Sequence, residues 1–156
     1  MRFQSLILLL VLATVASSCW HGPVSDSRQS GDLIVGLWES TDCASQGQSV
    51  TIRATVTNKG SRVFSVDLKD QPVLDIIIGN PDNSTIRWST GRQLTVDLTR
   101  LELQPEQSRD IYLEWVATTS TTIWARFIDN PTDPRGPIFS HLALFVEPAC
   151  PGPFGP

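Results

Sequence analysis

The chain has 156 residues, with 16 acidic against 12 basic side chains and a formal net charge of −4. An acidic surface of this kind argues against nucleic acid as a partner and against adhesion to anionic membranes by charge alone. The apolar fraction of 40%, which includes five Trp and six Phe, can fill the core of about one domain and excludes wholesale disorder.

The N-terminus has the features of an export signal. Arg2 precedes an apolar run over residues 6–16, and two serines at 17 and 18 lead to Cys19. This order of charged, apolar and small residues is typical of a signal peptide. The apolar run is shorter than the roughly 20 residues that a membrane-spanning helix requires. We therefore expect residues 1–18 to be a signal peptide.

Two interpretations of the cleavage site remain open. The segment resembles a bacterial lipoprotein signal, which implies cleavage before Cys19 and lipid attached to that cysteine. The small residues at 16–18 also satisfy the rule for ordinary secretion. The first interpretation places the protein outside the cytoplasm, anchored to the cell membrane or envelope through its lipid. The second makes it a secreted protein.

The two ends of the processed chain are expected to lack regular structure. Residues 19–31 are small and polar with no apolar period, which predicts a flexible tether after the lipidated cysteine. Residues 148–156 contain four prolines and predict a Pro/Gly-rich tail. The folded domain is therefore expected to span residues 32–147.

Inside this domain, apolar residues recur with a period of two. Residues 50–56 alternate between apolar and polar side chains, as in a strand with one buried face. Residues 58–61 predict a hairpin turn into a second strand over 64–68. Residues 33–38 and 138–146 are apolar on both faces, which is typical of central strands. Further strands are expected at 73–78, 86–88, 94–98, 111–115 and 123–127.

One break in this period carries information about topology. The apolar set changes phase between Leu98 and Leu101, which predicts a bulge or a crossing to a second sheet near residues 99–100. No stretch outside the signal has a convincing helical period. The prediction is an all-β fold, an immunoglobulin-like antiparallel β-sandwich of about seven to nine strands.

The three cysteines are explained if Cys19 is lipidated, because Cys43 and Cys150 then remain as a pair. Outside the cytoplasm such a pair usually oxidises, and this disulfide would join the start of the domain to its end. Two unpaired buried thiols are the alternative. No CxxC or Cys–His cluster is present, so no metal site is expected.

Catalytic chemistry has little support in the sequence. The two histidines are His21, in the expected tether, and His141, in an apolar strand. No Gly-x-Ser-x-Gly motif is present. We therefore expect a protein that is not an enzyme and that needs no cofactor.

Trp124 is a candidate for ligand contact because of its phase. It alternates with Ile123 and Ala125, so it is predicted to point outward if those two residues point into the core. An exposed aromatic ring can stack on a sugar or anchor a protein partner. The alternative is a tryptophan covered by a neighbouring loop.

Three short motifs give a family resemblance. They are Ile-Arg-Trp-Ser at 86–89, Leu-Gln-Pro-Glu at 103–106 and Tyr-Leu-Glu-Trp at 112–115. With the strands before them, residues 50–115 resemble the BsuPI domain, which is named for an intracellular proteinase inhibitor of bacilli. The resemblance implies an immunoglobulin-like fold and a protease as partner. The best-matched positions are Trp88 and the turn that follows it, with Ser89 and Arg92.

The resulting hypothesis is a membrane-anchored, non-enzymatic β-sandwich that binds a protein, with a serine protease as the specific candidate, through Trp88, Ser89 and Arg92. One alternative is a carbohydrate- or cell-wall-binding module that uses Trp124. Another is an accessory domain of an envelope complex.

Overall fold

The computed structural model describes residues 21–84 and 86–150, so the expected signal peptide, Cys19 and the last six residues lie outside the described part. One helical turn is present there, α1 (Val96–Thr99). The strands are β1 (Val24–Ser30), β2 (Leu33–Glu39), β3 (Cys43–Ala44), β4 (Ser49–Asn58), β5 (Phe64–Asp67), β6 (Leu74–Ile78), β7 (Ile86–Arg87), β8 (Arg100–Leu103), β9 (Ser108–Val116), β10 (Thr121–Phe127) and β11 (Ile138–Val146).

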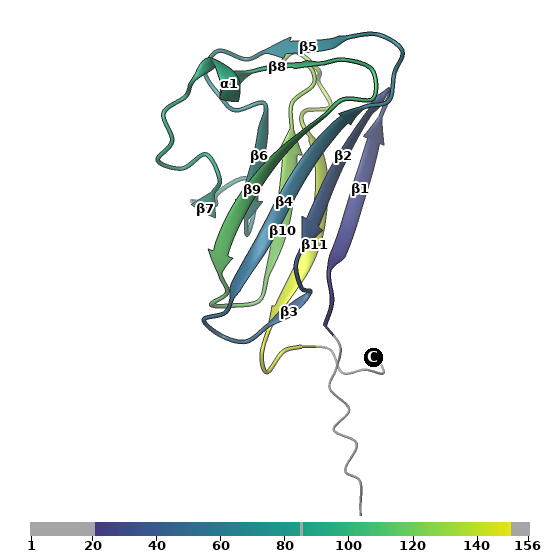
Figure 1. Cartoon of the computed structure of the whole chain (residues 1–156). Helices are drawn as coiled ribbons and strands as arrows, with labels where there is room; N and C mark the ends of the chain where they lie inside the picture. The colour runs from purple at the N-terminus through teal and green to yellow at the C-terminus, as the bar shows by residue number, and fades with distance from the viewer. Residues whose placement is uncertain (1–20, 85, 151–156) are drawn as a thin grey trace, which may run out of the picture.

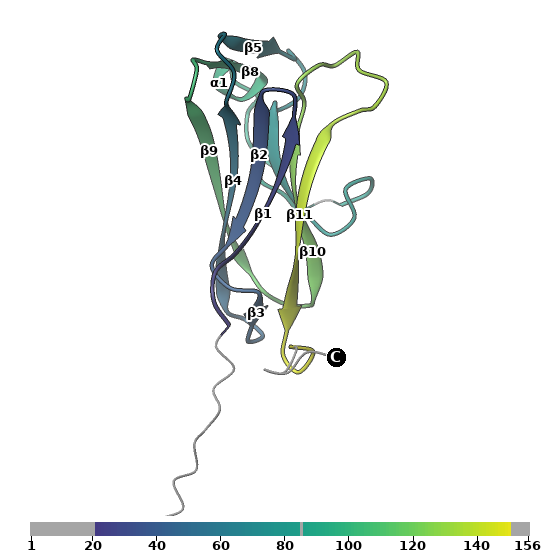
Figure 2. The ribbon, with the colours of Figure 1, turned by 90° about the vertical axis from the view of Figure 1, so that its right-hand side faces the viewer.

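Two sheets face each other across one core (Figure 2). The first sheet has the antiparallel order β1-β2-β4-β9, and the second has the order β3-β11-β10-β6-β7, in which only the short β3–β11 pair is parallel. A separate ribbon of β5 and β8 closes one end of the sandwich (Figure 1). The predicted immunoglobulin-like β-sandwich is confirmed. The described part has eleven strands, more than expected, because β1, β3 and β8 were not predicted.

Alternation along the strands builds the core. In β4 the residues Val50, Ile52, Ala54 and Val56 are all 0% exposed, and the polar residues between them face outward. In β10 the residues Ile123, Ala125 and Phe127 meet them from the second sheet. The period-two prediction is therefore confirmed for these strands. Burial of these apolar side chains is the main contribution to the stability of the fold.

The predicted hairpin at residues 58–61 is wrong, because β5 pairs with β8 and not with β4. Buried Asn58 is the reason. Its Nδ2 donates to the carbonyls of Arg62 and Leu103, at 2.7 and 3.0 Å, and its Oδ1 accepts from the Gly60 N–H. These bonds tie the end of β4 to β8, so the following chain continues into the ribbon that closes the sandwich.

The strand predicted at residues 94–98 is also wrong. Leu94 and Val96 are 45% and 69% exposed, and the chain forms the helical turn α1. The backbone N–H groups of Leu98 and Thr99 both donate to the carbonyl of Thr95. The apolar residues change phase because of this helical turn, and not because of a bulge or a strand that crosses between the sheets. Leu101 is buried on β8 directly after the turn.

The predicted tether contains a strand, which corrects the domain boundary. All seven residues of β1 pair with β2, across a two-residue turn in which Gly31 has a φ of 57°. The carboxylate of Asp26 accepts bonds from the Ser140 hydroxyl at 2.8 Å and the His141 N–H at 3.2 Å. The folded domain therefore begins no later than residue 24, and β1 is held to both sheets.

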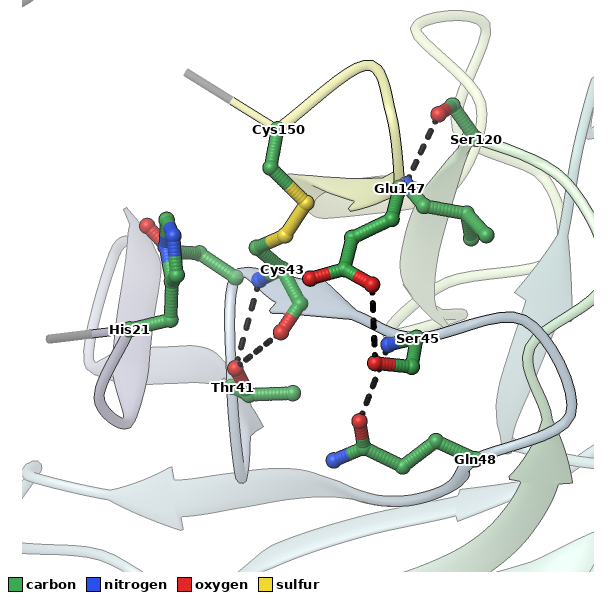
Figure 3. Close-up of a disulfide and its surroundings, with 10 residues drawn as sticks. His21, Thr41, Cys43, Ser45, Gln48, Ser120, Glu147 and Cys150 are labelled. Carbon is green, nitrogen blue, oxygen red and sulfur yellow. Dashed lines mark hydrogen bonds and ion pairs between the residues drawn. A yellow bond between two sulfur atoms is a disulfide. The ribbon is translucent and has the colours of Figure 1, made fainter. Parts of the chain in front are cut away.

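The disulfide between Cys43 and Cys150 is present, as predicted, with a Cα–Cα distance of 5.6 Å. It joins β3 to the segment that leaves β11 at the end of the sandwich opposite the β5–β8 ribbon (Figures 1 and 3). Thr41 supports it, since its hydroxyl accepts from the Cys43 N–H and donates to the Cys43 carbonyl. Ser45 donates to Glu147 across the same junction at 3.0 Å. We call this part of the molecule the disulfide end.

Candidate functional site

Residues 88–92 form a surface turn whose first residue is anchored in the fold. The turn follows β7, and the half-buried ring of Trp88 packs against the hydrophobic core. Its backbone N–H donates to the carbonyl of Ile76 at 2.9 Å. Trp88 is therefore the point at which the turn is fastened to β6.

Ser89 is held by a buried carboxylate. Its N–H and hydroxyl donate to the two oxygens of Asp75, at 3.1 and 2.8 Å. Asp75 lies in β6 and is only 1% exposed. Burial raises the pKa of Asp75, while the Ser89 bonds and the charge of Arg87 act in the opposite direction. The two hydrogen bonds from Ser89 thus replace bonds that water would donate to an exposed carboxylate.

Arg92 closes the turn. Its guanidinium carbon lies 4.4 Å from the centre of the Trp88 ring, and its Nε donates to the Trp88 carbonyl at 2.8 Å. Gly91 has a φ of 75°, the left-handed conformation that glycine adopts without strain. The exposed residues 90–92 are consequently carried on a turn with fixed attachments at Trp88, Ser89 and Arg92.

Trp124 lies on the outer face of the second sheet, in the direction that its phase predicts. Its ring is half-buried, because His141 stacks on it at a centroid distance of 4.6 Å and Phe139 meets it edge-on at 5.8 Å. The indole Nε1 is buried and has no hydrogen-bond partner. A shallow hollow beside the ring is bordered by residues 79–82. Trp124 is thus partly covered by its own sheet and partly open.

The structure brings Trp124 and the turn onto one face. Strand register puts Arg126 between Phe139 of β11 and Asp75 of β6, and Asp75 in turn holds Ser89. Arg126 is half-buried and donates to the amide of Gln71 at 2.9 Å. Burial lowers the pKa of Arg126, and the positive charge of Arg87 adds to this effect. The two sites proposed separately from sequence therefore border the same surface.

Glu39 is a buried acid that the sequence analysis did not single out. It ends the inward-facing row of β2, is 0% exposed, and neither carboxylate oxygen has a hydrogen-bond partner. Burial raises the pKa of Glu39 to about 8, and the charge of Asp42 contributes. Its position could have been found from sequence, because it continues the alternation of Leu33, Val35 and Leu37.

Both histidines of the chain contact other side chains. His21 contacts the Asp42 carboxylate at 3.3 Å, and His141 stacks on Trp124. Within residues 21–84 and 86–150, no group of three His, Cys, Asp or Glu side chains is placed to hold a metal ion. In the same ranges no helix is long and apolar enough to cross a membrane.

Together these features define an immunoglobulin-like β-sandwich domain with a clamped surface turn. The chain belongs to the BsuPI family, described as intracellular proteinase inhibitor, whose sequence model matches residues 38–124. The match runs from β2 into β10 and is wider than the resemblance over 50–115. It includes Trp88, Ser89, Arg92 and Trp124. The chain is therefore a proteinase-inhibitor-like β domain.

The comparison with solved structures returned matches of low structural similarity and low sequence identity. A CARDB domain from Pyrococcus furiosus, solved in complex with di-metal ions, has a TM-score of 0.42 and 11% identity, over 80% of this chain and 89% of that one. A β-glucosidase from Listeria innocua, in complex with laminaribiose, has a TM-score of 0.36 and 7% identity, over 81% of this chain and 17% of that one. The search of curated proteins found no match.

Proposed function

We propose that this protein is a non-enzymatic binding domain that inhibits a serine protease through the turn at residues 88–92. The observation that carries the proposal is the pair of hydrogen bonds that Ser89 donates to the buried carboxylate of Asp75. An inhibitory loop that is already rigid loses little conformational entropy when it enters a protease cleft. Membership of the proteinase-inhibitor family supports the same partner.

The turn also suggests which contacts a protease would make. The Arg92 side chain is occupied by the Trp88 ring and carbonyl, so it serves to fix the turn and is not free to fill a deep specificity pocket. The exposed part of the turn includes Gly91, whose backbone has no side chain in front of it. We therefore expect mainly backbone contacts, which suit a protease with broad specificity such as a subtilisin better than trypsin.

The test is a titration of the purified protein against a panel of serine proteases that includes a subtilisin and trypsin. We expect stoichiometric loss of subtilisin activity, and weaker inhibition by Ser89→Ala and Arg92→Ala, which loosen the turn. Ser61→Ala, a change at an exposed serine outside the turn, is the control. Full protease activity in the presence of excess protein would refute the inhibitor proposal.

We also propose that the protein is exported and anchored to the membrane by lipid on Cys19. The order of Arg2, the apolar run and the small residues before Cys19 supports this location. Cys19→Ser should move the protein from the membrane fraction to the soluble fraction of cells that express it. A variant that stays with the membrane would show that lipid on Cys19 is not the anchor.

A saccharide at Trp124 is less well supported than a protein partner on this face. A sugar normally stacks on the flat side of an indole. One side of the Trp124 ring is already stacked on His141, and Phe139 contacts the ring as well.

A further inference from the structure

The outer face of the first sheet carries a groove that lies away from the proposed inhibitory turn. Register places Trp38 of β2 beside Arg53 of β4, and in the next row Gly36 lies beside Thr55. The groove passes over Gly36, which has no side chain to fill it. Its lining consists of Ser25, Asp26, Ser27, Gly36, Leu37, Trp38, Arg53 and Thr55.

Nothing in the fold requires glycine at position 36. Its φ lies outside the left-handed range, and a Cβ built there would meet no atom closer than 3.9 Å, at the Asp26 carbonyl and the Thr55 side chain. Glycine in the middle of a strand is unfavourable, and it often marks a place where a ligand approaches the backbone closely. A larger residue would fit the strand but would fill the groove.

Arg53 gives the groove a positive charge that forms no ion pair among the described residues. Its guanidinium carbon lies 5.5 Å from the centre of the Trp38 ring, and its Nε is buried without a hydrogen-bond partner. Asp110 of β9 lies beside Thr55, in the row next to that of Arg53, and its carboxylate accepts a hydrogen bond from the Thr55 hydroxyl at 2.6 Å. An arginine in this setting is suited to receive a carboxylate.

We propose that this groove binds an acidic saccharide. A sugar carboxylate pairs with Arg53, and sugar hydroxyls bond to the exposed Ser25 and Ser27. The ring occupies the space above Gly36, beside Trp38. A peptide is a poorer fit, because peptides that bind sheets add to an open edge by backbone bonds, whereas β2 is already paired on both sides by β1 and β4.

The test measures binding of tri-galacturonate to the purified protein by calorimetry, with maltotriose as the neutral trisaccharide. We expect saturable binding of tri-galacturonate and none of maltotriose. Arg53→Gln should weaken binding about 10- to 100-fold, as expected for loss of a hydrogen-bonded charge. Arg62→Gln removes an exposed positive charge elsewhere and should leave binding unchanged.

Gly36→Val provides the decisive variant. It fills the groove with a residue that favours strands, so binding should be lost while the melting temperature stays the same or rises. Gly36→Ala serves the same purpose if the valine variant does not fold. Absence of tri-galacturonate binding would refute the proposal, as would unchanged binding by a folded Gly36 variant. If a glutamate-rich peptide binds with the same affinity as tri-galacturonate, the saccharide proposal is wrong and the groove binds an acidic protein segment. Because no protease is present, these results do not depend on the inhibitor proposal.

Discussion

The backbone N–H and the hydroxyl of Ser89 both donate to the carboxylate of Asp75, at 3.1 and 2.8 Å, although the two residues are 14 positions apart. This contact joins an exposed turn to a strand in which every residue is buried. The conformation of the turn therefore depends on the core of the second sheet as well as on the sequence of the turn.

Ser89→Ala should lower the free energy of unfolding by about 1 to 3 kcal/mol, because the buried carboxylate loses a charge-assisted bond. It should also raise the pKa of Asp75 further, since the hydroxyl bond lowers that pKa in the native protein. Urea denaturation measures the first effect. The control, Ser61→Ala, should change the unfolding free energy little. Equal stability of the Ser89 variant and the native protein would show that the contact is weak.

Reduction of the disulfide should lower the melting temperature. A link across 107 residues removes entropy from the unfolded chain, worth about 4 to 5 kcal/mol in the loop model. For a domain of this size the loss corresponds to a decrease on the order of 10 °C. The double variant Cys43→Ser, Cys150→Ser should melt at the lower temperature with or without reductant. An unchanged melt, with both thiols free by titration, would contradict the prediction.

Glu39 should make the domain less stable as the pH rises from 4.5 to 8. The folded protein keeps this proton up to about pH 8, whereas the unfolded chain releases it near 4.5. Unfolding therefore releases a proton in this window, and the free energy of unfolding falls as the pH rises, by on the order of 3 kcal/mol. Asp75, whose pKa is also raised, acts in the same direction.

The pH prediction is checked by urea denaturation at pH 5 and pH 8. Glu39→Gln keeps the shape of the side chain without its proton equilibrium, so its stability should change less between the two values. Glu102→Gln, a change at an exposed glutamate, should retain the native dependence. If Glu39→Gln loses as much stability as the native protein, Glu39 is not responsible.

Removal of β1 should destabilise the domain. A chain that begins at Gly31 loses the pairing with β2 and the Asp26 bonds to Ser140 and His141. We expect it to be at least about 2 kcal/mol less stable than a chain that begins at His21. It should also associate more readily, since the edge of β2 becomes open. Urea denaturation and size-exclusion chromatography of the two chains make the comparison. Equal stability would support the original tether hypothesis.

Sequence reasoning worked where a strand has one buried and one solvent-facing side. β10 and the part of β4 from Val50 to Val56 alternate cleanly because their inward positions are apolar. It failed for β1, an edge strand whose side chains are mostly exposed and whose inner face includes the charged Asp26. Such a strand has no apolar period, so its composition resembles that of a linker.

The candidate site was predicted in part. The Arg-Trp-Ser motif identified Trp88 and Ser89, and the phase of β10 gave the direction of Trp124. Asp75 and Arg126 were missed, because their importance comes from cross-strand pairing, which the sequence around each residue does not contain. The role of Arg53 depends in the same way on its position beside Trp38.

The early start of β1 limits how far the domain could stand from a bilayer. Five residue steps separate Cys19 from Val24, a reach of roughly 17 Å when fully extended. His21 already contacts Asp42 near the disulfide end, and only two residue steps separate His21 from Cys19, a span of at most roughly 7 Å. If Cys19 carries a lipid, the disulfide end would therefore lie next to the lipid headgroups of the bilayer. The β5–β8 ribbon would point into the surrounding medium, and any partner would have to approach from the flanks or from that outer end.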